Sequence, residues 1–225
     1  MSRRLPAVGA FVAGVALMAC SHRSPLLQPT PEELVAPAPD SFDVTFTTSR
    51  GPFVVRAHRD WSPYGADRFY FLAANGYYDQ ARFFRVVKGF VVQFGISGNP
   101  LVNAAWKERT IPDDQVLRSN VRGMMSFARS GPNSRTVQVF INYRDNSRLD
   151  TLGGSGFPPF AQVVQGMDVV DSLYSGYGEG PPRGKGPSQD SIMLQGNPYL
   201  QRAFPKMDYI QSARVTQQWL DTLDA

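Results

Sequence analysis

The side chains that most often perform acid–base, nucleophilic or metal chemistry are scarce in this sequence. Its 225 residues include two histidines, His22 and His58, and one cysteine, Cys20. A zinc site built from histidine and cysteine needs about four such ligands and a disulfide needs two thiols, so both are excluded. A nucleophile–histidine pair would have to use His58, for which an ordinary surface role is expected. Neither a P-loop nor a dinucleotide fingerprint occurs.

The composition fits one globular domain with short appendages. Hydrophobic residues make up 42% and charged residues 19%, which is too apolar for a disordered chain. The formal net charge is +4, and two of the positive charges, Arg3 and Arg4, lie in a segment that we expect to be removed. Without them the net charge is too small to favour a nucleic-acid partner. We also expect a monomer with no cofactor and no metal.

Residues 1–20 predict an export signal. Two arginines precede an apolar run over residues 5–18, which is short for a membrane span of about 20 residues. The run ends in Leu17-Met18-Ala19-Cys20, which resembles the bacterial lipobox, and Ser21 follows. We expect lipidation of Cys20 and a place in the bacterial cell envelope, on the periplasmic face of the outer membrane. A plain signal peptide with a chance cysteine and an uncleaved anchor are the alternatives.

The elements that must position any site begin after a proline-rich linker over residues 21–41, typical of a semi-extended spacer. Apolar and polar residues then alternate on both sides of a turn at 49–52, which predicts a hairpin. Further short apolar runs follow at 83–87, 90–94, 123–128, 137–141, 160–164 and 209–215. A folded domain is thus expected over residues 42–216, with a tail over 217–225.

Two helices are expected among these strands. Ser62 followed by Pro63 predicts an N-cap, and apolar spacing predicts a helix over residues 63–75. A second, short helix is expected around residues 167–174. Many short strands with two helices favour an all-β fold, a closed antiparallel barrel. The Gly- and Pro-rich stretch over 176–205 is expected to be a mobile surface loop.

Two blocks of the sequence resemble the cyclophilin family. The first, residues 83–93, reads FFRVVKGFVVQ and carries the family's Phe, Arg, Gly-Phe and Gln in order. The second repeats the family's next block at its spacing, in SFA at 126–128, GPNS at 131–134 and QVFI at 138–141. The resemblance spans about residues 42–216. It implies a closed eight-stranded antiparallel β-barrel capped by two α-helices, and catalysis of rotation about the bond preceding proline in a bound peptide.

This reaction breaks no covalent bond. Amide resonance opposes rotation with a barrier of about 18–20 kcal/mol, so an enzyme needs to hold the proline and favour the twisted amide over the planar one. Twisting localises the lone pair on the proline nitrogen, and a fixed donor then binds the transition state better than either ground state. Arg85, which matches the family's arginine, has the permanent charge and rigid fork of donors for this role.

The resemblance implies the rest of the site. Gln93 is expected to position Arg85 and the substrate backbone. Ala128 and Arg129 are expected to offer main-chain groups to the peptide, as an added strand would. The whole expected substrate-binding set is Phe90, Val91, Ala128, Arg129, Gln138, Phe140, Leu149 and Phe157.

Several positions depart from the family pattern. Phe84 replaces the histidine that precedes the catalytic arginine, and Arg129 replaces an asparagine. Arg148 stands for the pocket tryptophan and Phe157 for the pocket histidine. Because the arginine and the glutamine are kept, activity is expected with altered specificity.

Two functions remain open from the sequence, and both take proline-containing polypeptides as partners. Arg85 and Gln93 favour a peptidyl-prolyl isomerase that acts on exported proteins. The altered pocket rim at Arg148 and Phe157 leaves room for a membrane-tethered peptide-binding or scaffold module with little or no turnover.

Overall fold

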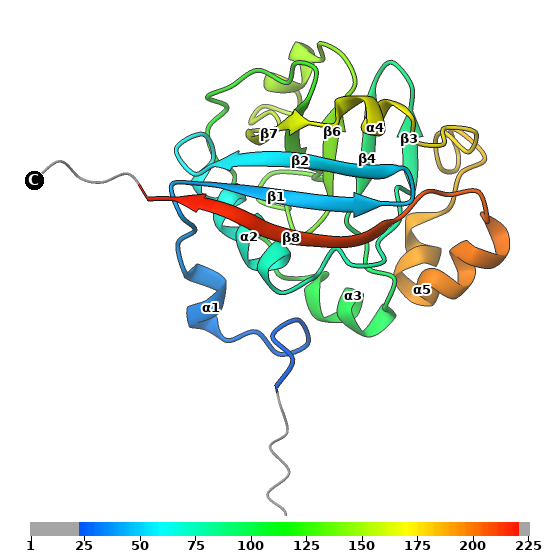
Figure 1. The fold of residues 1–225 in the computed structure, drawn as a ribbon, viewed down its shortest axis with the longest axis horizontal. Coiled ribbons are helices and arrows are strands. Elements are labelled where there is room, and N and C mark those ends of the chain that lie inside the picture. The colour runs from blue at the N-terminus through cyan, green and yellow to red at the C-terminus, as the bar shows by residue number, and fades with distance from the viewer. Residues whose placement is uncertain (1–22, 221–225) are drawn as a thin grey trace, which may run out of the picture.

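Eight antiparallel strands form one curled sheet in the computed structural model, which describes residues 23–220 (Figure 1). Their order across the sheet is β3-β4-β6-β5-β7-β2-β1-β8. The strands are β1 (Ser41–Thr48), β2 (Gly51–His58), β3 (Arg85–Val87), β4 (Val91–Phe94), β5 (Met124–Phe127), β6 (Val139–Asn142), β7 (Pro159–Gln165) and β8 (Ile210–Trp219). The expected export signal and Cys20 lie outside the described residues.

The sheet is a curled half-barrel, so the expected closed barrel is not seen. Strands β3 and β8 are its two edges, and they share no ladder. A bridge between Arg82 and Tyr209, together with backbone hydrogen bonds between residues 80–83 and 208–210, joins the segments next to them. Strand β3 is three residues long, and β4 is the only strand with which it pairs among the described residues.

The hairpin of β1 and β2 confirms the predicted alternation and supplies much of the core. Phe46 lies opposite Phe53 and Val44 opposite Val55, and all four side chains are buried. The Phe46 and Phe53 rings stack with centres 4.8 Å apart. Burial of each such side chain contributes about 1.5–3 kcal/mol, which fixes the register because a one-residue slip would expose the whole set.

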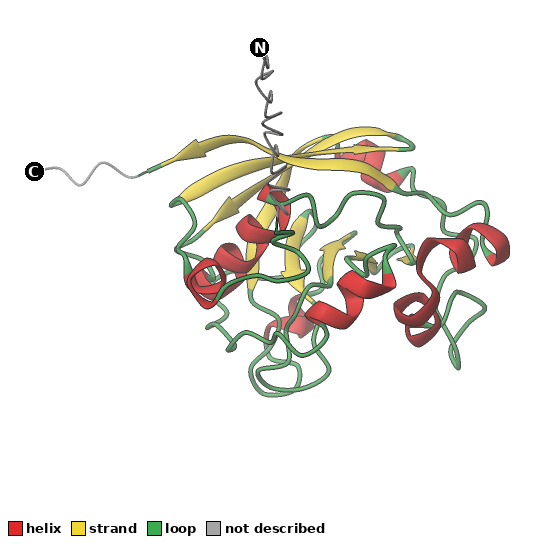
Figure 2. Ribbon diagram, turned by 90° about the horizontal axis from the view of Figure 1, so that it is seen from below, coloured by secondary structure: helices red, strands yellow, loops and turns green. Residues whose placement is uncertain are grey.

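The helices exceed the two that we expected, and most lie on one side of the long strands (Figure 2). Helix α2 confirms the prediction over residues 63–75, and α4 the short one near 167. None of the helices in residues 23–220 is long and apolar enough to cross a membrane. The helices are α1 (Pro31–Val35), α2 (Pro63–Ala74), α3 (Pro100–Trp106), α4 (Met167–Asp171), α5 (Gln189–Ala203) and the short 3-10 helix η1 (Ser147–Asp150).

The N-terminus of α2 is capped from another part of the chain. Ser62 makes no side-chain bond to the helix, contrary to expectation, and its hydroxyl instead donates to Asp114. The Asp114 carboxylate accepts the N–H groups of Tyr64 and Gly65 at 3.1 and 3.0 Å. Buried Arg135 pairs with the same carboxylate at 2.9 Å, so the cap is also a core ion pair.

The stretch over residues 176–205 is not the plain loop that we expected, because helix α5 fills its second half. Gly196 has non-helical dihedral angles and Pro198 follows it, which breaks the helical pattern in the sequence. Part of the expected spacer also packs on the domain, since the Trp106 indole N–H donates to the Leu26 carbonyl at 2.8 Å. Strand β8 continues to Trp219, past the expected end of the domain.

Candidate active site

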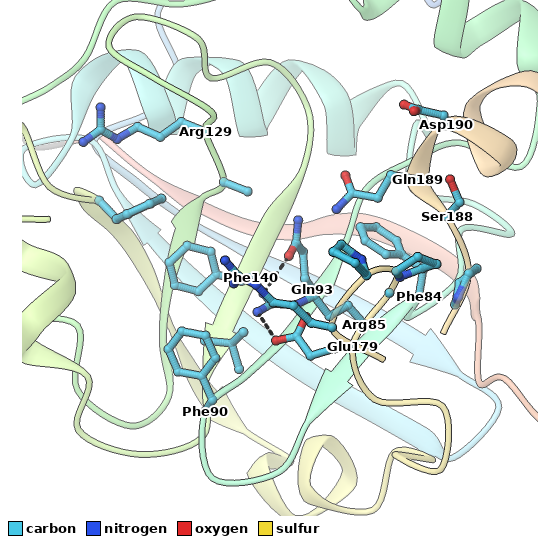
Figure 3. A pocket seen from close by; sticks show the side chains of 18 of the residues that line it. Phe84, Arg85, Phe90, Gln93, Arg129, Phe140, Glu179, Ser188, Gln189 and Asp190 are labelled. Atoms are coloured by element: carbon cyan, nitrogen blue, oxygen red, sulfur yellow. Dashed lines mark hydrogen bonds and ion pairs between the residues drawn. The ribbon is translucent and has the colours of Figure 1, made fainter. Parts of the chain in front are cut away.

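A cavity of about 750 Å³ lies between the β3, β4 and β6 region of the sheet and the segment from Glu179 to Asp190 (Figure 3). All but one of the site residues expected from the sequence line it. They are Arg85, Phe90, Val91, Gln93, Ala128, Arg129, Phe140, Leu149 and Phe157. The exception is Gln138, which contacts Gln93 without lining the cavity.

Strand register places Arg85, Gln93 and Phe140 side by side across three strands. Arg85 on β3 pairs with Gln93 on β4, which pairs in turn with Phe140 on β6. Cross-strand partners share one face of a sheet, so these three side chains meet. Arg85 Nη1 donates to Gln93 Oε1 at 3.0 Å, and Gln93 Nε2 donates to Gln138 Oε1 at 2.8 Å. Gln93 is buried, and both ends of its amide are engaged, so its orientation is fixed.

A carboxylate that the sequence did not reveal binds Arg85 from the far side. Arg85 Nε and Nη2 donate to the two oxygens of Glu179 at 2.7 and 2.6 Å. These bonds hold the pKa of the Glu179 carboxyl below its ordinary value. The partners are 94 positions apart in sequence, and Glu179 lies in a Gly- and Pro-rich stretch with no motif, so no local signal could have found it.

Apolar side chains form a pocket next to Arg85 and Gln93. Val91, Phe140 and Leu149 are buried together, and Phe90, Ala128 and Phe157 pack against them. The Phe140 and Phe157 rings meet edge to face with centres 5.7 Å apart. The Phe157 N–H donates to the Leu149 carbonyl at 3.0 Å, which ties the Phe157 loop to η1. The pocket suits a small apolar ring such as that of proline.

Two further arginines contact aromatic rings of the pocket, and of these Arg129 lines the cavity whereas Arg148, expected at its rim, does not. The Arg129 side chain, expected only for its backbone, is 4% exposed and donates to the Leu152 carbonyl at 2.9 Å. Exposed Arg148 places its guanidinium 5.1 Å from the centre of the Phe90 ring. Ala128 already donates its N–H to the Gln138 carbonyl at 2.9 Å, so a bound peptide could use only the Ala128 carbonyl oxygen.

The remaining departures from the family pattern are explained by packing. Phe84 is buried in a second apolar cluster with Ile192 and Leu200 of α5, where a histidine would lose its hydration. His58 lies away from the cavity and stacks on Trp61 with ring centres 4.0 Å apart. The described residues contain no group of three or more His, Cys, Asp or Glu that could hold a metal ion.

Comparisons with known proteins agree with this geometry. The family described as cyclophilin type peptidyl-prolyl cis-trans isomerase/CLD matches residues 43–195. Peptidyl-prolyl cis-trans isomerase B of Escherichia coli (strain K12) is 36% identical over 135 residues, which cover 58% of this chain and 82% of that protein. Human peptidyl-prolyl cis-trans isomerase-like 3 is 31% identical over 136 residues, covering 58% and 80%.

The fold agrees as well. A crystal structure of a cyclophilin type peptidyl-prolyl cis-trans isomerase from Cryptosporidium parvum aligns with a TM-score of 0.56 at 20% identity, over 79% of this chain and 99% of that chain. The family match covers more than half of the chain, and the aligned part contains Arg85, Gln93 and the apolar pocket. The chain therefore belongs to the cyclophilin family, and its reaction is the cis–trans isomerisation of peptidyl-prolyl bonds.

Proposed function

We propose that this isomerase acts on proline-containing segments of exported polypeptides, by non-covalent stabilisation of the twisted amide, while Cys20 tethers it to a membrane. One observation carries the catalytic part. The Arg85 guanidinium lies 5.5 Å from the centre of the Phe90 ring, at the edge of the apolar pocket, and two partners fix it there. A proline ring in the pocket would bring its nitrogen near a preorganised donor.

The apolar pocket would bind the proline, and Arg85 would stabilise the twisted amide. Phe90, Phe140 and Leu149 would hold the proline ring, so that the bond before it is the part left free to turn. The Ala128 carbonyl oxygen would accept a backbone N–H of the peptide. Arg85 would donate to the proline nitrogen as its lone pair localises, an interaction that is stronger in the twisted state than in either planar state and so lowers the barrier.

The test is turnover of a peptide with one Ala-Pro bond, measured by two-dimensional exchange NMR spectroscopy. The parent chain should accelerate exchange. Arg85→Ala should lower kcat about a hundredfold, the usual cost of losing one preorganised donor, with a smaller change in KM. A folded Arg85→Ala variant at the parent rate would overturn the mechanism. Peptide binding by the parent without accelerated exchange would favour the scaffold module.

The tether has a separate test. The proposal is supported by the export pattern of residues 1–20 and the position of Cys20 at its end. Because Leu26 is bonded to the domain and Cys20 lies six positions before it in the sequence, an anchor at Cys20 would hold the domain close to the membrane surface. Cys20→Ala should release the protein from washed membranes. A processed Cys20→Ala chain that still needs detergent for extraction would contradict a lipid anchor at this residue.

A further inference from the structure

Glu179 and Gln93 divide the donors of Arg85 between them. Glu179 accepts from Nε and Nη2, and Gln93 accepts from Nη1. A guanidinium carries five N–H groups, and these three bonds leave two without an acceptor among residues 23–220. Those two N–H groups are available to donate to a substrate. Figure 3 shows the guanidinium held between the two side chains, with Phe90 and Phe140 beside it.

We infer that Glu179 is a positioning residue for catalysis, which fixes the plane of the Arg85 guanidinium at the mouth of the proline pocket. The inference rests on the proposed role of Arg85. An arginine side chain has many rotamers, and a bidentate carboxylate fixes both its position and its plane. Gln93 accepts from one nitrogen only, and the guanidinium could still rotate about that single hydrogen bond. Arg85 sits on a three-residue edge strand, so the strand itself gives little support.

The segment that carries Glu179 is built to hold its backbone in place. The Gly186 N–H donates to the Glu179 carbonyl at 2.8 Å. A Cβ on Gly184 would lie 2.3 Å from the same oxygen, so only glycine allows the chain to fold back this closely. Next to it, Tyr177 packs edge to face on Phe204 with ring centres 5.0 Å apart. The carboxylate is therefore presented by an ordered turn.

The geometry favours a positioning role for Glu179 over an inhibitory one. An inhibitory segment would fill the proline pocket, whereas Glu179 stands in the wall and leaves a cavity of about 750 Å³ open. The carboxylate does reduce the positive field of Arg85 at the amide. The two effects act in opposite directions on kcat, so the sign of the change on removing Glu179 decides between them.

Glu179→Ala and Glu179→Gln should be compared with the parent by exchange NMR spectroscopy. Glu179→Ala is expected to lower kcat roughly tenfold, with KM within about twofold, because misplacement affects the transition state more than binding. Glu179→Gln keeps one acceptor oxygen, so its kcat should lie between those of the parent and Glu179→Ala. The Arg85 Nε–H resonance should exchange with water slowly in the parent and quickly in Glu179→Ala, which shows that the carboxylate holds this group, and the fall in kcat at nearly constant KM then distinguishes positioning from a merely structural role.

Two controls match these variants. Lys185→Ala alters an exposed residue of the same segment, and Asp171→Ala breaks a bidentate pair with Arg122 away from the cavity. Neither should change kcat. Gly184→Ala keeps the carboxylate but disturbs the turn, and should reproduce part of the Glu179→Ala loss. If Gly184→Ala does not fold, the Glu179 variants decide alone.

The outcomes separate this inference from the proposed function. A rise in kcat in Glu179→Ala would show that the contact is inhibitory and overturn the inference. An unchanged kcat in Glu179→Ala, beside a hundredfold loss in Arg85→Ala, would overturn the inference and leave the proposed function standing. Unchanged rates in both variants would overturn both.

Discussion

The guanidinium of Arg129 lies 5.1 Å from the centre of the Phe157 ring, which itself packs edge to face on Phe140. Arg129 also donates to Asp113 at 3.4 Å and to the Leu152 carbonyl at 2.9 Å. Its side chain therefore links the pocket wall to two neighbouring loops. A residue expected only to offer its backbone thus supports the ring that closes the pocket.

Replacing this arginine should weaken substrate binding. Arg129→Ala removes the contact with Phe157 and leaves the half-buried Asp113 carboxylate without that partner, so KM should rise several-fold and the free energy of unfolding should fall by about 1–3 kcal/mol. Steady-state kinetics and urea denaturation measure the two effects. Arg122→Ala is the control, since its exposed pair with Asp171 should contribute about 0–1 kcal/mol. An unchanged KM in a folded Arg129→Ala would contradict the support role.

Phe140→Ala should raise KM more than it lowers kcat, because it removes apolar contact with the proline ring and leaves Arg85 and its partners in place. The side chain is 5% exposed, so the unfolding free energy should also drop by about 3–5 kcal/mol. Circular dichroism must show that the variant folds. A loss confined to kcat, with KM unchanged, would show that Phe140 does not bind the substrate.

The pairing of Glu179 with Arg85 predicts an acid limb in the rate. Arg85 lowers the pKa of Glu179, so the ion pair is intact above the ordinary glutamate value of 4.5 and is lost as pH falls through the lowered pKa. The parent kcat should be level near neutrality and decline in that acid range. Glu179→Gln should have a lower rate that stays level there.

Other charges share this cavity and set the control for the pH experiment. Arg183, in the same segment, and Asp190, at the start of α5, also line it. Asp190 is the second carboxylate in the cavity lining, so Asp190→Asn should keep the acid limb if Glu179 causes it. Circular dichroism at each pH separates loss of the pair from unfolding. The same acid limb in Glu179→Gln would assign it to another group.

Restoring the family's histidine at Phe84 should destabilise the protein. Phe84 is 3% exposed and packs with Ile192 and Leu200, so Phe84→His buries polar ring nitrogens and should cost about 1–3 kcal/mol of unfolding free energy. Amide exchange along α5 should rise at the same time. Phe84→Leu keeps an apolar side chain and should lose less. Equal stability of Phe84→His and the parent would show that α5 does not depend on this contact.

The sequence predicts best where neighbours in the chain determine the geometry. The Lys88-Gly89 turn joins β3 and β4 directly, so a local motif was enough to place Arg85 opposite Gln93. The β1–β2 hairpin followed from alternation for the same reason. The Asp114 cap of α2 could not be found in this way, because its acceptor comes from a loop 49 positions beyond Gly65.

Composition misled where glycine and proline serve tight packing. The segment before α5 reads as a flexible loop, yet Gly184 and Gly186 permit close approach to the backbone of Glu179. Gly196 and Pro198 interrupt the helical pattern of α5 in the sequence. A closed barrel was expected from the number of strands and from the resemblance, and the structure shows a curled half-barrel with β3 and β8 at its edges.

The pairing of β1 with β8 has a consequence for when the protein can fold. Ser41 lies opposite Trp219, so the first strand of the sheet must wait for nearly the whole described chain before its outer edge is covered (Figure 1). Contacts this distant in sequence form slowly, and an uncovered edge can pair with other chains. For a chain exported as proposed above, this delay would keep the sheet incomplete until β8 has been synthesised.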